Sequence, residues 1–389
     1  MNLDLKQENV QQFIRANEYQ NIRLVSLQKS PFPTISSAEL AQQIKGLQVA
    51  KNKFPNYYKT ERILYPPSIN LEQASSQITA QYKSKLISGN TVVDLTSGFG
   101  IDSYAFSQNF QNVISVERNE ELAEIVRYNY TVLNTQNIQV VSSDFEEFWK
   151  LSSNENWDVI YIDPSRRKGS QRKYFLSDLE PDILQWINPF FQRTKTVMVK
   201  LSPLLDLKAV IEQVPTIRQI HLVAVKNEMK ELLLICNNEV ENQPTIHCVN
   251  LETAQAEFSF EWEAKNQMKI EFSSPLKYIY EPNSAILKSG AFHLIGQEFH
   301  LKKLHDNTHL YTSDIFVKTF PGRIFEMLEE VRDAKRKLPN QSFHVLTKNY
   351  PTSVEVIRKK YKLKESDAQS LIFTQSISGK HILLCKKIQ

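Results

Sequence analysis

The chain has 389 residues, 41% of them hydrophobic, and a net charge of +4 from 47 Lys and Arg against 43 Asp and Glu. This fits a folded protein of two or three domains, and the mildly basic balance permits a nucleic-acid partner without requiring one. Three scattered cysteines exclude a disulfide frame. No apolar run approaches the roughly 20 residues of a membrane span, and residues 1–15 lack a signal-peptide core. We therefore expect a cytoplasmic protein without a membrane partner.

Residues 1–88 read as a helical block. Apolar residues recur at helical spacing, and helices are expected over 34–46 and 71–87. Basic and aromatic side chains mix between residues 51 and 62. The block is either a packing layer for the rest of the chain or a surface that contacts nucleic acid by charge and stacking.

From residue 91 the hydrophobic period changes, and short apolar runs alternate with helical ones. The expected strands are 92–95, 113–116, 138–142, 159–162 and 197–200. The expected helices are 103–109, 120–133, 145–149, 179–191 and 207–213. This alternation predicts an α/β fold, a parallel sheet with helices on both faces.

The rhythm changes again at residues 219–225 and 231–236, two apolar runs with five residues between them. Parallel neighbouring strands need a long crossover connection, and five residues are too few. The two runs are therefore expected to form an antiparallel hairpin at the end of the sheet. A parallel sheet with a reversed terminal strand is characteristic of class I S-adenosylmethionine-dependent methyltransferases, whose Rossmann-like fold residues 91–238 resemble.

The remainder of the chain reads as α+β. Residues 239–275 form a connector or an extra hairpin. A helix is expected over 284–294 and a pair of strands over 298–304 and 309–311. Further strands and a helix follow, and we expect two small units with a seam near residues 320–322.

The stretch from Val92 to Gly100 is the centre of the predicted site. A β-branched strand stops in a loop that contains Gly98 and Gly100, and a helix follows from Ile101. Glycine allows a sharp turn and a close approach of the backbone to a ligand. An ordinary strand-to-helix turn is the alternative reading.

Acidic residues end four successive strands: Asp94, Glu117, Asp144 and Asp163. Ligands of open α/β sheets bind outside the carboxyl ends of the strands, so these acids are expected to share one rim. Glu117 suits two ribose hydroxyls, and Asp144 suits an adenine amine. Any one of the four could instead be a helix N-cap.

The loop is similar to the acidic, glycine-rich first motif of the methyltransferases. That resemblance implies that the methionine part of the cofactor is held by Asp94, Thr96, Gly98 and Gly100. Thr96 stands where many members have glycine. Together with Asp102, it makes the motif look like that of bacterial 16S ribosomal RNA guanine-N2 methyltransferases.

Asp163 and Pro164 resemble the motif used when a methyl group goes to an exocyclic nitrogen. Such an amine is a poor nucleophile because its lone pair is delocalised. An acceptor such as Asp163, beside a carbonyl fixed by Pro164, can orient that lone pair. Ser165 and Arg166 replace the last two positions of the common signature, which disfavours adenine N6 and leaves guanine N2.

A basic cluster follows directly and includes Arg166, Arg167 and Lys168, with Arg172 and Lys173 beyond. It is either a solvated loop or a contact for substrate phosphates. Residues 200–203 end the next strand and are expected to line the same pocket. The eight histidines do not cluster at ligand spacing, so no metal is predicted.

Over nearly its whole length the chain resembles bacterial methyltransferases with a C-terminal THUMP-like domain. The expected domains are 1–88 (helical), 89–240 (methyltransferase), 241–275 (connector or hairpin), 276–320 (ferredoxin-like) and 321–389 (THUMP-like). The resemblance implies S-adenosylmethionine as cofactor and RNA as partner. We expect methyl transfer to an RNA base nitrogen such as guanine N2. A protein or small-molecule substrate, or a non-catalytic RNA-binding role, is the alternative.

Overall fold

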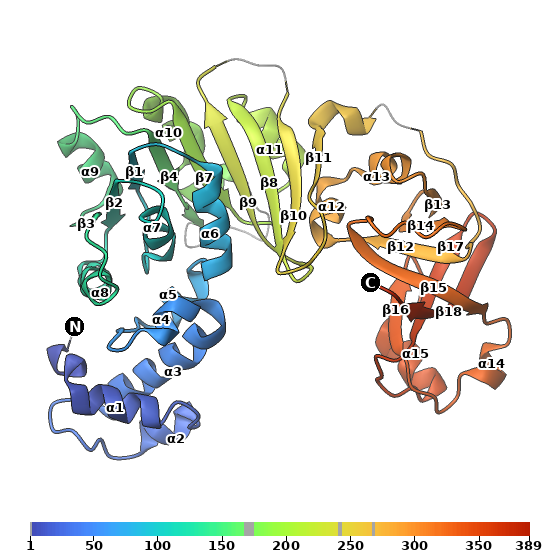
Figure 1. The fold of residues 1–389 in the computed structure, drawn as a ribbon, viewed down its shortest axis with the longest axis horizontal. Coiled ribbons are helices and arrows are strands. Elements are labelled where there is room, and N and C mark those ends of the chain that lie inside the picture. The colour runs from blue at the N-terminus through green and yellow to red at the C-terminus, as the bar shows by residue number, and fades with distance from the viewer. Residues whose placement is uncertain (1, 167–174, 240–242, 267–268) are drawn as a thin grey trace. The chain divides into compact units, whose positions relative to one another are not determined.

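The computed structural model describes residues 2–166, 175–239, 243–266 and 269–389. The chain forms two compact units, residues 1–218 with 233–240 and residues 219–232 with 241–389 (Figure 1). In the described parts of the chain, every helix is too short or too polar to cross a membrane.

The N-terminal block of the first unit is helical, as expected. Its helices are α1 (Glu8–Ala16), α2 (Ile22–Leu27), α3 (Ser37–Lys53), α4 (Pro55–Lys59), α5 (Ser68–Gln73) and α6 (Gln77–Leu86). The helix predicted over 71–87 is wrong: the backbone is extended at Ala74 and Ser76, and the Ser76 hydroxyl caps α6 by accepting from the Thr79 amide. The break frees Ser75 to point into the protein interior.

The same block packs against the methyltransferase-like sheet through helix α8 (Glu120–Val132). Residues of α3, α4 and α8 share one apolar core. The amide side chain of Asn129, fully buried on α8, accepts from the Leu64 amide and donates to the Leu64 carbonyl, at 2.9 and 2.8 Å. The packing role proposed for the block therefore has direct structural support.

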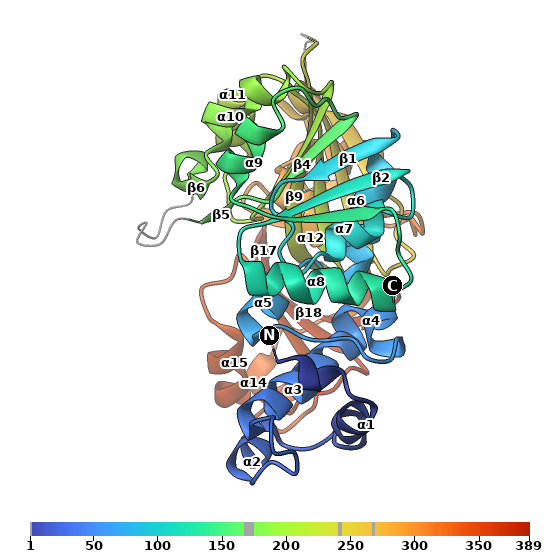
Figure 2. The same ribbon diagram turned by 90° about the vertical axis from the view of Figure 1, so that its left-hand side faces the viewer.

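Parallel strands form the centre of the first unit: β1 (Thr91–Asp94), β2 (Asn112–Glu117), β3 (Ile138–Ser142), β4 (Val159–Ile162) and β7 (Thr196–Leu201). Helices cover both faces, with α6, α7 (Ile101–Phe106) and α8 on one side and α9 (Phe145–Leu151), α10 (Ile183–Phe190) and α11 (Leu207–Gln213) on the other (Figure 2). Burial on both faces explains the continuous apolar runs of β1, β4 and β7.

The first sheet has nine strands in the order β11-β10-β8-β9-β7-β4-β1-β2-β3. Strands β8 (Ile217–Val225) and β9 (Glu228–Asn237) are joined by two residues, Lys226 and Asn227, both at positive φ, and form the predicted hairpin with its reversed strand. The chain order reverses between β4 and β2, on either side of β1. This confirms the predicted Rossmann-like class.

The hairpin does not end the sheet, contrary to expectation. Strand β10 (Thr245–Leu251) pairs in parallel with β8 over seven residues, and β11 (Phe258–Glu261) pairs antiparallel with β10. Ile246, Cys248 and Val249 of β10 are buried. Of the two readings of this region, the extra hairpin is therefore the one observed, and this hairpin extends the sheet.

The second unit contains a seven-stranded sheet in the order β13-β14-β12-β15-β18-β17-β16. The strands are β12 (Tyr278–Pro282), β13 (Lys302–His305), β14 (Thr308–Ser313), β15 (Gly322–Glu330), β16 (His344–Lys348), β17 (Ser370–Ser376) and β18 (Gly379–Lys387). Strand β15 pairs with both β12 and β18. One sheet therefore continues through the seam predicted near residues 320–322.

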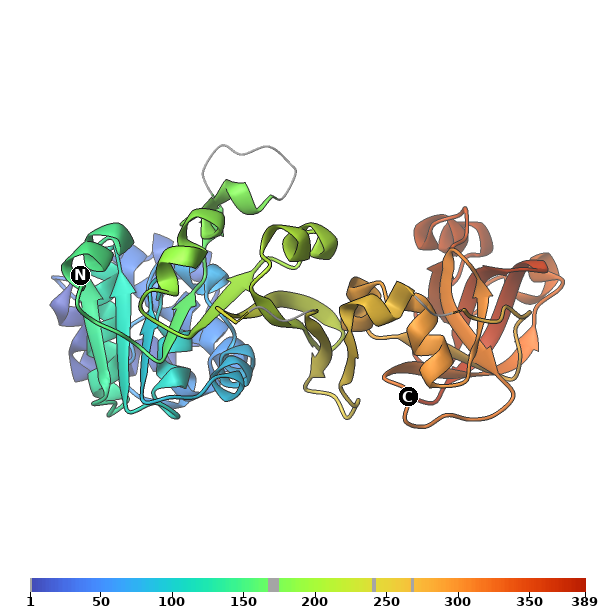
Figure 3. The ribbon, with the colours of Figure 1, turned by 90° about the horizontal axis from the view of Figure 1, so that it is seen from above.

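Among the described residues, these strands are accompanied by the α-helices α12 (Ser284–Ser289), α13 (Phe292–Glu298), α14 (Ala334–Lys337) and α15 (Val354–Tyr361). Helix α13 packs against β13 of this sheet, whose strands are drawn in orange to red in Figure 3, whereas α12 packs against β10 of the first sheet. The single helix predicted over 284–294 is wrong because Gly290, at φ +72°, ends α12 in the left-handed conformation.

Candidate active site

The loop between β1 and α7 is fixed to both neighbouring strands. The Leu95 amide donates to the Tyr161 carbonyl of β4 at 3.0 Å, and the Ser97 amide donates to the Val116 carbonyl of β2 at 2.9 Å. These bonds hold the loop where the strand order reverses. That point is where open α/β sheets bind their ligands.

The two glycines of the loop have different surroundings, although both are left-handed. Gly98 has φ +55° and donates its amide to Glu117 Oε2 at 2.9 Å, and a Cβ added there would meet no atom within 4 Å. Gly100 has φ +77°, and an added Cβ would lie 2.2 Å from Tyr130 Oη. Gly98 therefore borders open space, while Gly100 is required by packing.

Asp94 lies fully buried below the loop. Its carboxylate accepts from the Ser103 hydroxyl at 2.6 Å and from the Thr96 amide at 3.1 Å. Burial, with the charges of Asp102 and Asp163, raises the pKa of Asp94 to about 8, against the lowering effect of these hydrogen bonds. One oxygen bonds the loop and the other bonds helix α7, so Asp94 ties the loop to the helix that follows it.

Glu117 and Asp144 lie at the ends of β2 and β3. Glu117 accepts from the Gly98 amide and, through Oε1, from the Asn119 amide at 2.8 Å. Asp144 is exposed and caps α9 by accepting from the Glu146 amide at 2.9 Å. Asp144 is therefore a helix N-cap in this structure. Its assignment to the adenine of the cofactor stays a prediction.

Asp163 and Pro164 follow β4. The Asp163 amide donates to Thr96 Oγ1 at 2.7 Å, and its Oδ2 lies 2.5 Å from Lys200 Nζ at the end of β7. Pro164 is buried. The sequence placed residues 200–203 at this pocket but gave no sign of the ion pair. The structure gathers Asp94, Thr96, Gly98, Glu117 and Asp163 around the β1–α7 loop, as two hydrogen-bonded groups, Asp94–Thr96–Asp163 and Gly98–Glu117.

A buried ionic group lies beneath this set and was not foreseen. Lys83 of α6, fully buried, lies 3.2 Å from Asp102 Oδ1, while Asp102 Oδ2 accepts from Ser75 at 2.7 Å and from Tyr161 at 2.8 Å. Burial acts to raise the pKa of Asp102, but the charges of Lys83 and Lys200 and these hydrogen bonds outweigh it and lower that pKa. Polar residues at helical positions were the only sequence signal.

The predicted basic cluster is only partly within the described residues. Ser165 and Arg166 form the short strand β5, which pairs with β6 (Leu179–Glu180). Arg167 and Lys168, with Arg172 and Lys173, lie outside the described residues. Glu180 pairs at 3.3 Å with Arg118, the residue after Glu117.

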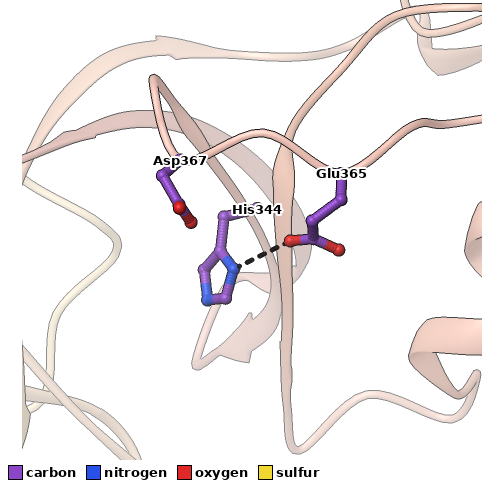
Figure 4. Close-up of side chains that lie close together, drawn as sticks. All are labelled: His344, Glu365 and Asp367. Carbon is purple, nitrogen blue, oxygen red and sulfur yellow. Dashed lines mark hydrogen bonds and ion pairs between the residues drawn. The ribbon is translucent and has the colours of Figure 1, made fainter. Parts of the chain in front are cut away.

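One group in the described ranges has the residue types of a metal site, far along the sequence from this loop. It consists of His344, Glu365 and Asp367 in the second unit (Figure 4). His344 Nδ1 lies 3.2 Å from one Glu365 oxygen, and the other oxygen pairs with Arg358. The guanidinium already supplies the cation for this carboxylate, so we assign no metal here.

The loop offers both space and a polar group to a ligand. Besides the open side of Gly98, the Ser97 hydroxyl is buried and has no hydrogen-bond partner among the described residues. A buried polar atom without a partner is uncommon in folded proteins. Space and an unpaired hydroxyl together fit a bound polar molecule.

Comparison with known proteins agrees with this architecture. Residues 70–198 match the family model described as conserved hypothetical protein 95, residues 278–321 match a ferredoxin-like domain and residues 322–387 match a THUMP domain-like model. An uncharacterized S-adenosylmethionine-dependent methyltransferase of Mycobacterium tuberculosis H37Rv is 19% identical over 79% of this chain and 84% of its own length.

A solved structure matches almost the whole chain. The crystal structure described as a "putative methyltransferase" from Porphyromonas gingivalis W83 is 30% identical, covers 98% of both chains and has a TM-score of 0.88. S-adenosylmethionine is thus the cofactor, as its relatives' descriptions indicate. The chain belongs to the family of S-adenosylmethionine-dependent methyltransferases that carry ferredoxin-like and THUMP-like domains at the C-terminus.

Proposed function

We propose that this methyltransferase acts on RNA, at an exocyclic base nitrogen such as guanine N2. The observation that carries the proposal is the Asp163–Pro164 tip, which is bonded through Thr96 to the glycine loop. This bond connects the cofactor loop to a carboxylate suited to an acceptor amine. An acceptor nitrogen and a methyl donor must lie within contact distance for direct transfer.

The cofactor would be held along the rim of the sheet. Asp94, Thr96, Gly98 and Gly100 form the loop assigned to its methionine part, Glu117 is assigned to the ribose and Asp144 to the adenine. The open side of Gly98 and the unpaired Ser97 hydroxyl support a ligand at this loop. S-adenosylmethionine supplies a methyl group on a sulfonium, whose sulfur becomes a neutral thioether when the methyl leaves.

The protein's own task is then to prepare the amine. An exocyclic amine delocalises its lone pair into the base, so it is a weak nucleophile. Asp163 would accept a hydrogen bond from the amine and direct its lone pair toward the methyl carbon, while Pro164 fixes the backbone beside it. The nitrogen forms one N–C bond and loses one proton to the surrounding water.

Two features support RNA as the substrate. Residues 322–387 match a THUMP domain-like model. Within them, residues 331–364 contain ten Lys and Arg but only Asp333 and Glu355 as acids, a net charge of +8, whereas the whole chain carries +4. The rest of the chain is therefore net −4. Such local concentration of positive charge is the electrostatic footprint of phosphate binding.

The basic residues of that segment lie mainly on two helices, α14 and α15, that border the same apolar cluster. Residues of α14 and α15 flank one apolar cluster that includes Leu338 and Ile357. The side chains of Lys335, Arg336, Lys359, Lys360 and Lys362 are exposed. Exposed cations of this kind can bind the phosphates of a sugar-phosphate backbone.

The first experiment measures methyl transfer to three pools. Full-length protein and tritiated S-adenosylmethionine are incubated with total RNA, protein lysate or metabolite extract from cells that lack the protein. We expect label in RNA, and digestion with mass spectrometry should identify N2-methylguanosine. Label confined to protein or metabolites would refute the RNA substrate and favour the corresponding alternative.

The second experiment tests the role of Asp163. Asp163→Ala should abolish transfer while calorimetric titration with S-adenosylmethionine stays close to wild type. Surviving activity would show that another group orients the acceptor. A wild-type protein that binds no cofactor at millimolar concentration would instead favour the non-catalytic RNA-binding alternative.

A further inference from the structure

Lys200 is held directly against the proposed acceptor-orienting carboxylate. Strands β4 and β7 pair in parallel with Ile162 opposite Val199, so Asp163 and Lys200 are the next residues on each strand. Lys200 Nζ lies 2.5 Å from Asp163 Oδ2, and the side chains of Lys200 and Asp163 are 13% and 31% exposed. A pair this sheltered is screened far less by salt and water than the usual surface pair.

The position of Lys200 also offsets the crowding of several acidic groups. Asp94, Asp102 and Asp163 lie near one another, since the charges of Asp102 and Asp163 add to burial in raising the pKa of Asp94. Lys200 acts on two of these acids. It pairs with Asp163, and its charge helps Lys83 to lower the pKa of Asp102 against the effect of burial.

Asp163 is thus fixed at two points. Thr96 Oγ1 holds its backbone amide, and Lys200 holds Oδ2. In the described parts of the chain, Oδ1 has no hydrogen bond or ion pair. Because both the backbone amide and one carboxylate oxygen of Asp163 are held, its side chain can rotate little. The second oxygen, Oδ1, therefore keeps a constant direction.

We propose that Lys200 is a positioning residue for methyl transfer: by holding Oδ2 of Asp163, it leaves Oδ1 to accept from the methyl-acceptor amine. This inference rests on the proposed role of Asp163. It does not depend on whether the acceptor is RNA. Loss of the ammonium frees Asp163 to rotate and removes one of the charges that stabilise the Asp102 carboxylate, which misdirects the acceptor without removing the cofactor loop.

The test compares Lys200→Met, Lys200→Arg and a surface control, Lys208→Met, in the full-length protein. Lys208 is exposed, and its Nζ lies 3.8 Å from a carboxylate oxygen of Glu212, which is one helical turn away and also exposed. The rate of S-adenosylhomocysteine formation is measured with whichever of the three pools wild type methylates. Cofactor affinity is measured by calorimetric titration, and thermal unfolding checks the fold.

We expect Lys200→Met to lower kcat by about 10- to 100-fold, the range for misplaced reacting groups, with cofactor affinity within about twofold of wild type. Lys200→Arg, which restores a cation, should recover part of the rate. Adding Lys200→Met to Asp163→Asn should cost little more than Asp163→Asn alone, because both changes remove one function. Lys208→Met should behave as wild type.

Three results would overturn the inference: an unchanged kcat in Lys200→Met, a loss matched by an equal loss of cofactor affinity, or additive losses in the double variant. If Lys200→Met does not fold, Lys200→Arg and Lys200→Gln are compared, and equal rates for these two would overturn it as well. A fully active Asp163→Asn would instead refute the role of Asp163 in the proposed function. The two failures are therefore distinguishable.

Discussion

Thr96 and Asp163 are joined by a 2.7 Å hydrogen bond although 67 residues separate them in the chain. The Thr96 hydroxyl, at a position where many class I methyltransferases have glycine, is the acceptor, and the Asp163 amide is the donor. The bond ties the β1–α7 loop to the residue that we propose orients the methyl-acceptor amine. It also gives a physical reason for threonine at this position.

Thr96→Val should therefore impair catalysis more than cofactor binding. Valine keeps the shape but leaves the Asp163 amide without its acceptor, at a cost of about 1–3 kcal/mol in stability. Displacement of the tip by about 1 Å can cost about 100-fold in rate. Thr96→Ser keeps the hydroxyl and is the matched control. Equal kcat values for the two variants would show that the bond is not needed.

The two loop glycines should respond differently to alanine. Gly98→Ala meets no atom, so its stability loss is only the strain of a left-handed residue, about 1–2 kcal/mol, while its methyl group fills the space assigned to the cofactor. Gly100→Ala adds a clash with Tyr130 and should lower the unfolding temperature further. Thermal unfolding and calorimetric titration separate the effects. A Gly98→Ala protein with wild-type cofactor affinity would contradict the placement.

Asp94 should make the protein's stability depend on pH in an unusual direction. Its pKa is about 8 in the folded protein and near 4 when unfolded, so the folded state binds the extra proton between these values. The contribution of Asp94 to stability is therefore full below about pH 4 and falls until about pH 8. The unfolding temperature of Asp94→Asn, measured relative to that of wild type at the same pH, should rise as the pH increases from 5 to 8. A constant difference would refute the shift.

Lys83→Met should be strongly destabilising. The substitution leaves the Asp102 carboxylate buried without its cation, and breaking such pairs costs about 3–5 kcal/mol. Lys83→Met with Asp102→Asn removes both charges and should recover much of that loss. Urea unfolding of the single and double variants measures the coupling. A double variant less stable than Lys83→Met alone would contradict this account.

The basic face of the second unit should bind RNA mainly through phosphates. Replacing Lys359, Lys360 and Lys362 by Gln should weaken binding to total RNA and reduce the slope of log affinity against log salt by about 2, near 0.7 for each lost contact on single strands. Methylation should fall through KM rather than kcat. Lys208→Gln, on the first unit, is the control. Unchanged affinity in the triple variant would place RNA binding elsewhere.

Much of the first unit could be predicted from local pattern. Apolar strands buried on both faces give continuous runs, and acids placed directly after them must gather at one rim in a parallel sheet. That rule brought Asp94, Glu117 and Asp163 together. Helix breaks were harder: Gly290 and the extended backbone at Ala74 each divided a helix whose hydrophobic period continued.

The partners of the charged residues could not be predicted. Lys83 meets Asp102, and Lys200 meets Asp163, only because distant elements pack together, and sequence spacing carries no trace of that choice. Thr96 was visible as a departure from a motif, but its partner was not. Strand β10 was similarly ambiguous, since a short apolar run suits a free hairpin as well as an added strand.

The pairing of β10 with β8 has a practical consequence for dividing the protein. A fragment that ends near residue 239 would keep the glycine loop and the whole β8–β9 hairpin. It would lack β10, the strand that pairs with residues 219–225. Seven residues of mostly buried, apolar strand would then form a bare edge, which is a template for intermolecular pairing and aggregation. Fragments that end after Glu261 retain both covering strands and are the better choice for isolating the catalytic part.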